Sequence, residues 1–273
     1  MAQEKVGKIR MMPWPSKLIC LCARIFTAII LVMVIPDVQA DTDTDTLHSM
    51  LLKLAPPPSE QALEHIPDTG RKLLALRSYL RFGSKIAERW SWTEAEIAAF
   101  QDSQEQRSLL AEIEAVNQHF MAANPGYKLY VHGTVRSLDE QIAKWNENKS
   151  VGLAAQDILS AYTNTRLDKP GPAALAIWLR NYLPPNRPSL AAPGLTSHGR
   201  ALAIDFQIMK NGQIYAGANT KHVESLWRTE GWGQKLKTSI TAAGPSFSGP
   251  LTEPDEPWHY DYSPPASCTA GKK

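Results

Sequence analysis

Two short stretches of the sequence carry side chains of the kinds that zinc enzymes use. His198 is followed seven residues later by Asp205, and further along the chain Glu256 is followed three residues later by His259. Two imidazoles and one carboxylate can occupy three corners of a zinc tetrahedron and leave the fourth for water. The spare carboxylate of Glu256 can then accept a proton from that water. The sequence therefore predicts a zinc peptidase.

Hydrophobic alternation around the first stretch predicts the strand that would present Asp205. Apolar side chains occupy every second position between residues 202 and 208, which is the pattern of a strand with one buried face. Asp205 lies on the opposite face, beside two alanines that leave room for a metal and a substrate chain. His198 and Asp205 are an odd number of residues apart, so we expect a bend between them, at Gly199.

The second stretch is also expected to be extended. Pro254 and Pro257 disfavour a helix and bias the residues before them to extended backbone. We therefore expect His259 to point away from an aromatic face and to meet Asp205 from a neighbouring strand. The aromatic face, expected in the core, consists of Trp258, Tyr260 and Tyr262.

Three separated motifs carry a family resemblance. Residues 133–137 read Gly-x-x-Arg-Ser, His198 to Asp205 fit most of a Ser-x-His-x-x-Gly-x-Ala-x-Asp signature, and residues 256–259 read Glu-Pro-Trp-His. In this order the motifs resemble those of the zinc D,D-peptidases of bacterial cell walls. That family includes D-alanyl-D-alanine carboxypeptidases and dipeptidases and L-alanyl-D-glutamate endopeptidases, and it has a Hedgehog-like fold. The resemblance covers roughly residues 124 to 262.

The resemblance implies one Zn²⁺ held by His198, Asp205 and His259, with Glu256 as general base. It implies hydrolysis of peptide bonds involving D-amino acids in peptidoglycan stem peptides, in the manner of a D,D-carboxypeptidase. Which peptidoglycan bond is cut stays open, because carboxypeptidases and endopeptidases of the family differ in loops that the motifs do not describe.

Two positions depart from the family pattern. Thr196 stands where the family has Ser, which keeps a hydroxyl group. Ala201 stands where the family has Gly, and an alanine would be strained there if the backbone requires positive φ.

The remaining site residues have alternative roles. The resemblance gives Arg136 the role of stabilising the oxyanion of the tetrahedral intermediate, and a guanidinium can also hold a substrate carboxylate. With no catalytic role, Arg136 would form a salt bridge with Asp139 or Glu140. Thr196 and Ser197 are candidates to hydrogen-bond the substrate backbone or a carboxylate.

The first forty residues have the features of a secretory signal. A basic stretch precedes an apolar run over residues 25–35, and Val-Gln-Ala at 38–40 is a plausible cleavage site. We therefore expect export to the periplasm or cell envelope and no stable membrane association after cleavage. An uncleaved anchor is the alternative, although the run is short for a membrane span and Arg24 precedes it directly.

Charge and cysteine content exclude other function classes. Without residues 1–40, basic and acidic residues are nearly equal in number, so no basic patch favours a nucleic-acid partner. Cys268 is then the single cysteine, which excludes an intramolecular disulfide and a cysteine-based zinc site.

The expected fold class is α+β, a small antiparallel sheet flanked by helices and preceded by a helical N-terminal segment. After the signal we expect a linker at 41–58, the helical segment at 59–123, the peptidase domain at 124–262 and a disordered tail at 263–273. The helical segment would cap the catalytic part or contribute to substrate recognition.

Local signals place the elements of these segments. Capping boxes at Thr93 and Ser137 predict helices that reach about residue 123 and Trp145. Asn-Gly at 211–212 predicts a tight hairpin after the Asp205 strand. Further helices are expected over residues 71–90, 172–183 and 220–231, whereas the Gly/Ser/Thr-rich residues 233–252 are expected to be a loop or irregular strand beside the cleft.

A second function class also fits these motifs. The Hedgehog signalling domain resembles the family and keeps a zinc site, so the fold can serve recognition. The competing hypothesis is thus a catalytically silent, zinc-containing module that binds peptidoglycan or a protein.

Overall fold

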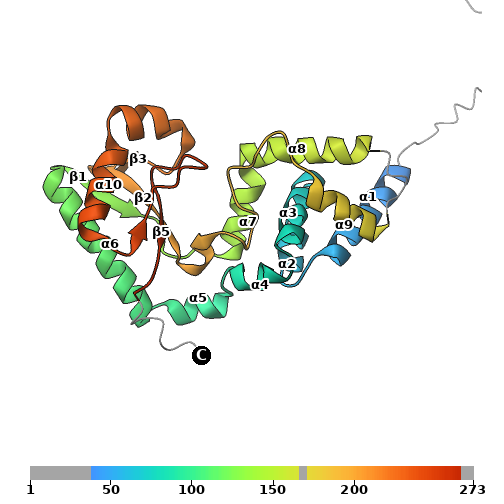
Figure 1. The fold of residues 1–273 in the computed structure, drawn as a ribbon, viewed down its shortest axis with the longest axis horizontal. Coiled ribbons are helices and arrows are strands. Elements are labelled where there is room, and N and C mark those ends of the chain that lie inside the picture. The colour runs from blue at the N-terminus through green and yellow to red at the C-terminus, as the bar shows by residue number, and fades with distance from the viewer. Residues whose placement is uncertain (1–37, 166–170, 266–273) are drawn as a thin grey trace, which may run out of the picture. The chain divides into compact units, whose positions relative to one another are not determined.

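The computed structural model describes residues 38–165 and 171–265 (Figure 1). Contacts divide the chain into a short unit, residues 1–41, and a larger unit, residues 42–273, which contains the sheet, both apolar clusters and the candidate site. The predicted signal peptide therefore lies almost entirely outside the described residues, as does Cys268. Helix α1, Val38–Leu54, includes most of the short helix that the sequence predicts from Leu47 to Ala55, and it begins earlier, within the part of the segment 41–58 that was predicted to be a linker. Among the described helices, none is both long and apolar enough to cross a membrane.

One helix before the sheet begins at the predicted cap, Thr93, and the helices break more often than predicted. They are α2 (Glu60–Glu64), α3 (Thr69–Phe82), a 3-10 turn (Gly83–Lys85), α4 (Ile86–Arg89), α5 (Glu94–Phe100) and α6 (Gln104–Ala123). The capping box at Thr93 is present. The single helix predicted from there to residue 123 is in fact two, because Asp102 adopts a positive φ of 58° and Ser103 caps a new helix.

Helices later in the chain include two that were not predicted. They are α7 (Leu138–Glu147), α8 (Lys149–Asn164), α9 (Pro172–Asn181) and α10 (Trp232–Ala243). Ser137 caps α7 as predicted. The prediction of a loop for residues 233–252 was wrong over its first half, which is α10. Residues 220–229, predicted as an α-helix, form a 3-10 turn (Thr220–His222) followed by a π-helix (Val223–Thr229).

The sheet is antiparallel and places β2 at its centre. Its strands are β1 (Tyr127–Val131), β2 (Ala203–Lys210), β3 (Gln213–Ala216), β4 (Phe247–Ser248) and β5 (His259–Tyr262). Their order is β1-β2-β5-β4, with β3 also paired to β2. Asn211 and Gly212 have φ values of 51° and 78°, as the predicted hairpin requires. The predicted α+β class, a small antiparallel sheet flanked by helices, is confirmed.

Apolar side chains form two clusters in the larger unit. In one, the buried face of the sheet, which includes Phe206 and Tyr260, packs with α6 and α10, and Figure 1 shows these helices beside the sheet. The other cluster joins α1, α2 and α3 to α7, α8 and α9. Each cluster thus takes elements from both sides of residue 123, where the sequence suggested a domain boundary.

The turn that leads from His198 into β2 lies at Ala201, not at Gly199 as predicted. Ala201 has φ 56° and ψ 27°, which is the left-handed region, and its side chain is only 4% exposed. Gly199 is needed for a different reason. A Cβ atom on Gly199 would lie 1.9 Å from the hydroxyl oxygen of Ser91, so only glycine allows these two segments to approach.

This backbone geometry predicts how substitutions at Ala201 behave. We expect Ala201→Val to lower the free energy of unfolding by about 2–3 kcal/mol, because a β-branched residue is poorly tolerated at positive φ and the site is buried. Ala201→Gly should change that free energy by less than about 1 kcal/mol, because relief of backbone strain is offset by loss of a buried methyl group. Urea unfolding midpoints measure both values. A valine variant as stable as the parent chain would show that the turn is not constrained to positive φ.

Candidate metal centre

Two neighbouring strands present Asp205 and His259 to each other. The two residues are directly opposite in the β2–β5 pairing, so their side chains lie on the same face of the sheet. The alternate residues Ile204 and Tyr260, also paired, are fully buried on the opposite face. The predicted alternation and the predicted meeting of Asp205 with His259 are therefore both present. Trp258 and Tyr260 are buried in the core, as expected.

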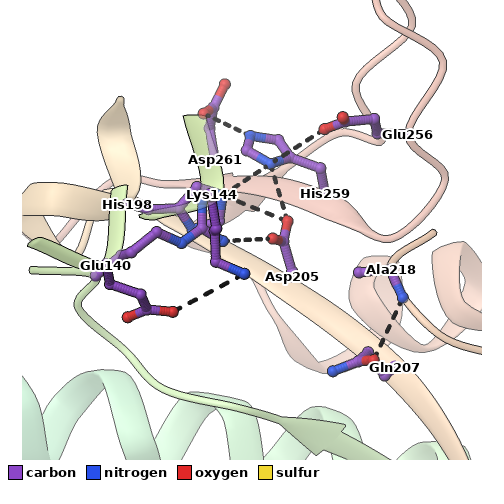
Figure 2. A network of polar contacts seen from close by, with 10 residues as sticks. Glu140, Lys144, His198, Asp205, Gln207, Ala218, Glu256, His259 and Asp261 are labelled. Carbon is purple, nitrogen blue, oxygen red and sulfur yellow. Dashed lines mark hydrogen bonds and ion pairs between the residues drawn. The ribbon is translucent and has the colours of Figure 1, made fainter. Parts of the chain in front are cut away.

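His198 reaches the same point from the 3-10 turn Ser197–Arg200. The backbone carbonyl of His198 accepts a 3.0 Å hydrogen bond from the backbone N–H of Arg136, which ties the turn to the segment before α7. The imidazole is almost fully buried, and its Nε2 atom lies 3.2 Å from Nδ1 of His259. The three predicted metal ligands thus converge, as Figure 2 shows.

The separations between the three donor atoms match the demands of a small divalent ion. His198 Nε2 and His259 Nδ1 are 3.2 Å apart, and Asp205 Oδ1 lies 3.4 Å from the first and 3.1 Å from the second. Tetrahedral zinc with bonds of about 2.0–2.1 Å places its ligand atoms about 3.3 Å apart. We refer to these three atoms, His198 Nε2, Asp205 Oδ1 and His259 Nδ1, as the donor triangle. Their residues form a group that can hold a metal ion.

The ionisation of the three groups is coupled. Although burial alone would raise it, the pKa of Asp205 is held far below its usual value by hydrogen bonds with His198 and His259, so the carboxylate is ionised. Burial lowers the pKa of His198, which favours the neutral imidazole that binds metals. Burial opposes protonation of His259 as well, but the hydrogen bond with Asp205 and the negative charges of Asp205, Glu256 and Asp261 together outweigh burial and raise the pKa of His259. A metal ion must therefore compete with a proton on His259.

Asp261 contacts the other ring nitrogen of His259. Its Oδ1 atom lies 3.6 Å from Nε2 of His259, on the far side of the ring from the donor triangle. A carboxylate in this place favours a proton on Nε2 and leaves the Nδ1 lone pair for a metal. Sequence reasoning did not single out this residue, although its position two residues after a ligand on the same strand offers a signal.

Glu256 is close to the donor triangle but is not part of it. The turn from Leu251 to His259 is closed by backbone hydrogen bonds between Leu251 and Glu256 and between Glu256 and His259. This turn leaves the Glu256 carboxylate 3.9 Å from His259 Nδ1, with its side chain 17% exposed. Burial and, second, the negative charge of Asp205 raise the pKa of Glu256 to about 7. A carboxylate with a raised pKa is a stronger base than usual, as the predicted role requires.

Arg136 pairs with the carboxylate of the candidate ligand Asp205. Its Nη2 atom lies 3.1 Å from Asp205 Oδ2, the oxygen that is not part of the donor triangle. The alternative prediction, a salt bridge with Asp139 or Glu140, was therefore wrong. The backbone hydrogen bond between Arg136 and His198 holds the loop before α7 beside the His198 turn, from where the guanidinium reaches Asp205.

A cleft of about 580 Å³ opens over the cluster. It is lined by all three donor residues, Arg136 and Glu256, and by Thr196 and Ser197, which the sequence predicted as substrate-binding residues. Lys144, which sequence reasoning missed, also lines it. This volume lies within the range of small-molecule and short-peptide sites.

A buried network of hydrogen bonds around Gln141 joins the segments that pack against the His198 turn. The side-chain amide of Gln141 donates hydrogen bonds to the Ser91 hydroxyl and to the Arg136 carbonyl, at 2.9 and 2.8 Å. Its carbonyl oxygen accepts from the backbone N–H of Gly194 at 2.8 Å. Ser91 and Gln141 are 4% and 5% exposed. The network therefore fixes three segments against one another around the candidate ligand His198.

Loss of this network should loosen the metal site. We expect Gln141→Met, which keeps the side-chain volume, to lower the free energy of unfolding by about 3 kcal/mol, because polar partners are left buried and unpaired. Zinc affinity should fall about tenfold, as for other residues that orient ligands. Urea unfolding and competition with a chromophoric chelator measure the two effects. Gln118→Met, on the exposed face of α6, is the matched control; equal zinc affinities in both variants would contradict a positioning role.

Comparison with known proteins adds no relative: no family model, no curated protein and no solved structure matches this chain.

Proposed function

We propose that the chain is a zinc-dependent peptidase of the bacterial periplasm or cell envelope that hydrolyses bonds involving D-amino acids in peptidoglycan stem peptides. The observation that carries the proposal is the donor triangle of His198, Asp205 and His259, with the Glu256 carboxylate beside it in an open cleft. The substrate class rests on the resemblance of the three motifs to the cell-wall D,D-peptidases.

The donor set favours zinc over other common ions. Two imidazole nitrogens and one carboxylate oxygen suit a borderline ion that accepts four ligands, whereas calcium and magnesium prefer six or more oxygen ligands. Three protein ligands are typical of catalytic zinc sites, and structural zinc sites generally have four. Zinc bound here would lower the pKa of a water at its open position and polarise a substrate carbonyl.

The surrounding side chains supply the remaining chemistry of peptide hydrolysis. The Glu256 carboxylate accepts a proton from the attacking water and later delivers it to the leaving amine. Arg136 orients Asp205 through the oxygen that faces away from the donor triangle, and its positive charge favours the oxyanion that develops on the substrate. Thr196 and Ser197 line the cleft, and we propose that their hydroxyl groups hydrogen-bond the peptide.

The decisive test combines metal analysis with digestion of the natural polymer. The purified protein should contain about one zinc per chain, and incubation with peptidoglycan should release fragments that mass spectrometry of the muropeptides identifies. A chelator should abolish this release, and added zinc should restore it. Bound zinc without any released fragment would instead support the silent binding module.

A further inference from the structure

The cleft over the donor triangle has an uneven distribution of charge. Its carboxylates other than Asp205 are Glu256 and Asp261, both beside His259. Its two Lys or Arg side chains are Arg136 and Lys144. Figure 2 draws Lys144 and Glu140 on one side of the cluster and Glu256 and Asp261 on the other. We call the side of the cleft with Arg136 and Lys144 the basic wall and the side with Glu256 and Asp261 the acidic wall; Glu140 lies beside Lys144 but lines the adjoining cavity and not this cleft.

Lys144 is the cation on the basic wall that is available to a ligand. Arg136 is already paired with Asp205 at 3.1 Å. Among the described residues, the carboxylate within ion-pair distance of Lys144 is that of Glu140, at 3.9 Å and one helical turn away on α7, and the two side chains are 46% and 38% exposed. An exposed pair of this length contributes little free energy, so the ammonium group can exchange Glu140 for a better partner without a large loss.

The position of Lys144 joins it to the reaction site. It lines the large cleft together with Thr196 and Ser197, and it also lines a smaller adjoining cavity of about 280 Å³, which Glu140 shares. His198 and Asp205 line both spaces as well. A peptide that extends along the cleft from the donor triangle toward α7 would thus bring its own polar groups to this ammonium.

We propose that Lys144 binds a carboxylate of the peptide substrate and so makes the cleft selective for anionic peptides; this proposal rests on the proposed function. The carboxylate is either the free C-terminus of the peptide or an acidic side chain next to the scissile bond. A lysine–carboxylate contact at this wall would place the negative group away from Glu256 and Asp261, where repulsion would oppose binding. Stem peptides carry both kinds of carboxylate, so substitution of each in turn identifies the one that is bound.

The experiment compares three peptides on the zinc-loaded protein. The first ends in D-alanyl-D-alanine and has a free C-terminus and one acidic side chain, the second is its C-terminal amide, and the third has the side-chain carboxylate converted to an amide. Dissociation constants from calorimetry and kcat/KM values are measured for the parent chain, Lys144→Gln and Lys144→Arg. Lys149→Gln, an exposed lysine that does not line the cleft, is the matched control.

We expect Lys144→Gln to weaken binding of the first peptide about tenfold, the effect of losing one charge-assisted contact, with a matching rise in KM. Binding of one of the two amides should be the same in Lys144→Gln and the parent chain, and that amide identifies the bound carboxylate. Lys144→Arg should retain most of the affinity. Equal losses for all three peptides, or no loss for any, would overturn the proposal. Carboxylate-dependent binding through Lys144 without hydrolysis would uphold it and refute the peptidase function.

Discussion

Glu256→Gln is expected to lower kcat for peptide hydrolysis about a thousandfold while zinc stays bound. The glutamine amide fits the same space in the turn before His259 but cannot accept a proton from the attacking water. Glu256 is outside the donor triangle, 3.9 Å from the nearest donor nitrogen, so the three metal ligands are unaffected. Steady-state kinetics on a stem peptide, with zinc content measured on the same preparation, separate loss of chemistry from loss of metal.

The same turn provides a control for that experiment. Glu253→Gln removes one negative charge from an exposed position three residues earlier and should leave kcat unchanged. If Glu256→Gln turns over substrate as fast as the parent chain, Glu256 has no role as the base. If it loses zinc together with activity, Glu256 acts in metal binding instead.

Asp205→Asn should remove the metal and the activity together. Asparagine keeps the shape of the side chain but loses the charge that balances zinc, so we expect zinc affinity to fall by more than about a hundredfold. Zinc affinity of the parent chain should rise with pH until His259 has lost its proton, because Asp205 raises the pKa of that histidine. Zinc titration at several pH values measures both effects, and an unchanged affinity in the variant would exclude Asp205 as a ligand.

The metal-free protein should also be less stable in this variant. Asp205 interacts with Arg136 and both histidines, and its side chain is 21% exposed, so we expect a loss of about 2 kcal/mol in the free energy of unfolding. Because the folded state lowers the pKa of Asp205, its contribution is complete above the ordinary carboxyl pKa of about 3.9 and is lost as pH falls below it. Asp139→Asn, on the exposed side of α7, is the control and should show neither effect.

The candidate metal ligands could be predicted from sequence because the information that places them is local. Alternation along β2 and β5 assigns each side chain to a face, and the small residues beside Asp205 indicate which face is open. The resemblance carried by the three motifs in their order then indicates that His198 joins Asp205 and His259 in one site. The misplaced bend shows the limit of this reasoning, because composition pointed to Gly199 whereas the positive φ belongs to Ala201.

Two helices escaped prediction although their signals were present. In α10 the buried residues Trp232, Leu236 and Ile240 recur at helical spacing, but the glycines and hydroxyl residues around them suggested a loop. In α8 the cap at Asn148 and the buried positions from Val151 to Ile158 give the same kind of signal.

The roles of Gln141 and Lys144 could not be read from the chain. Both lie on α7, and nothing local shows that one turn of this helix faces Ser91 and Gly194 while another faces the cleft. Such placements depend on how α7 packs against segments fifty or more residues away in sequence.

The close approach of Gly199 to Ser91, together with the packing of α6 against the sheet, has a consequence for the architecture of the chain. The region that carries the three motifs, residues 124–262, is not an autonomous module that can be excised or grafted elsewhere. Its hydrophobic core is completed by Leu109, Val116 and Phe120 from upstream, and the turn that bears its first histidine rests on a serine more than thirty residues before the first motif. The leading helices are therefore a structural part of the unit that holds the candidate metal centre, and variation in them would be transmitted to the geometry of that centre.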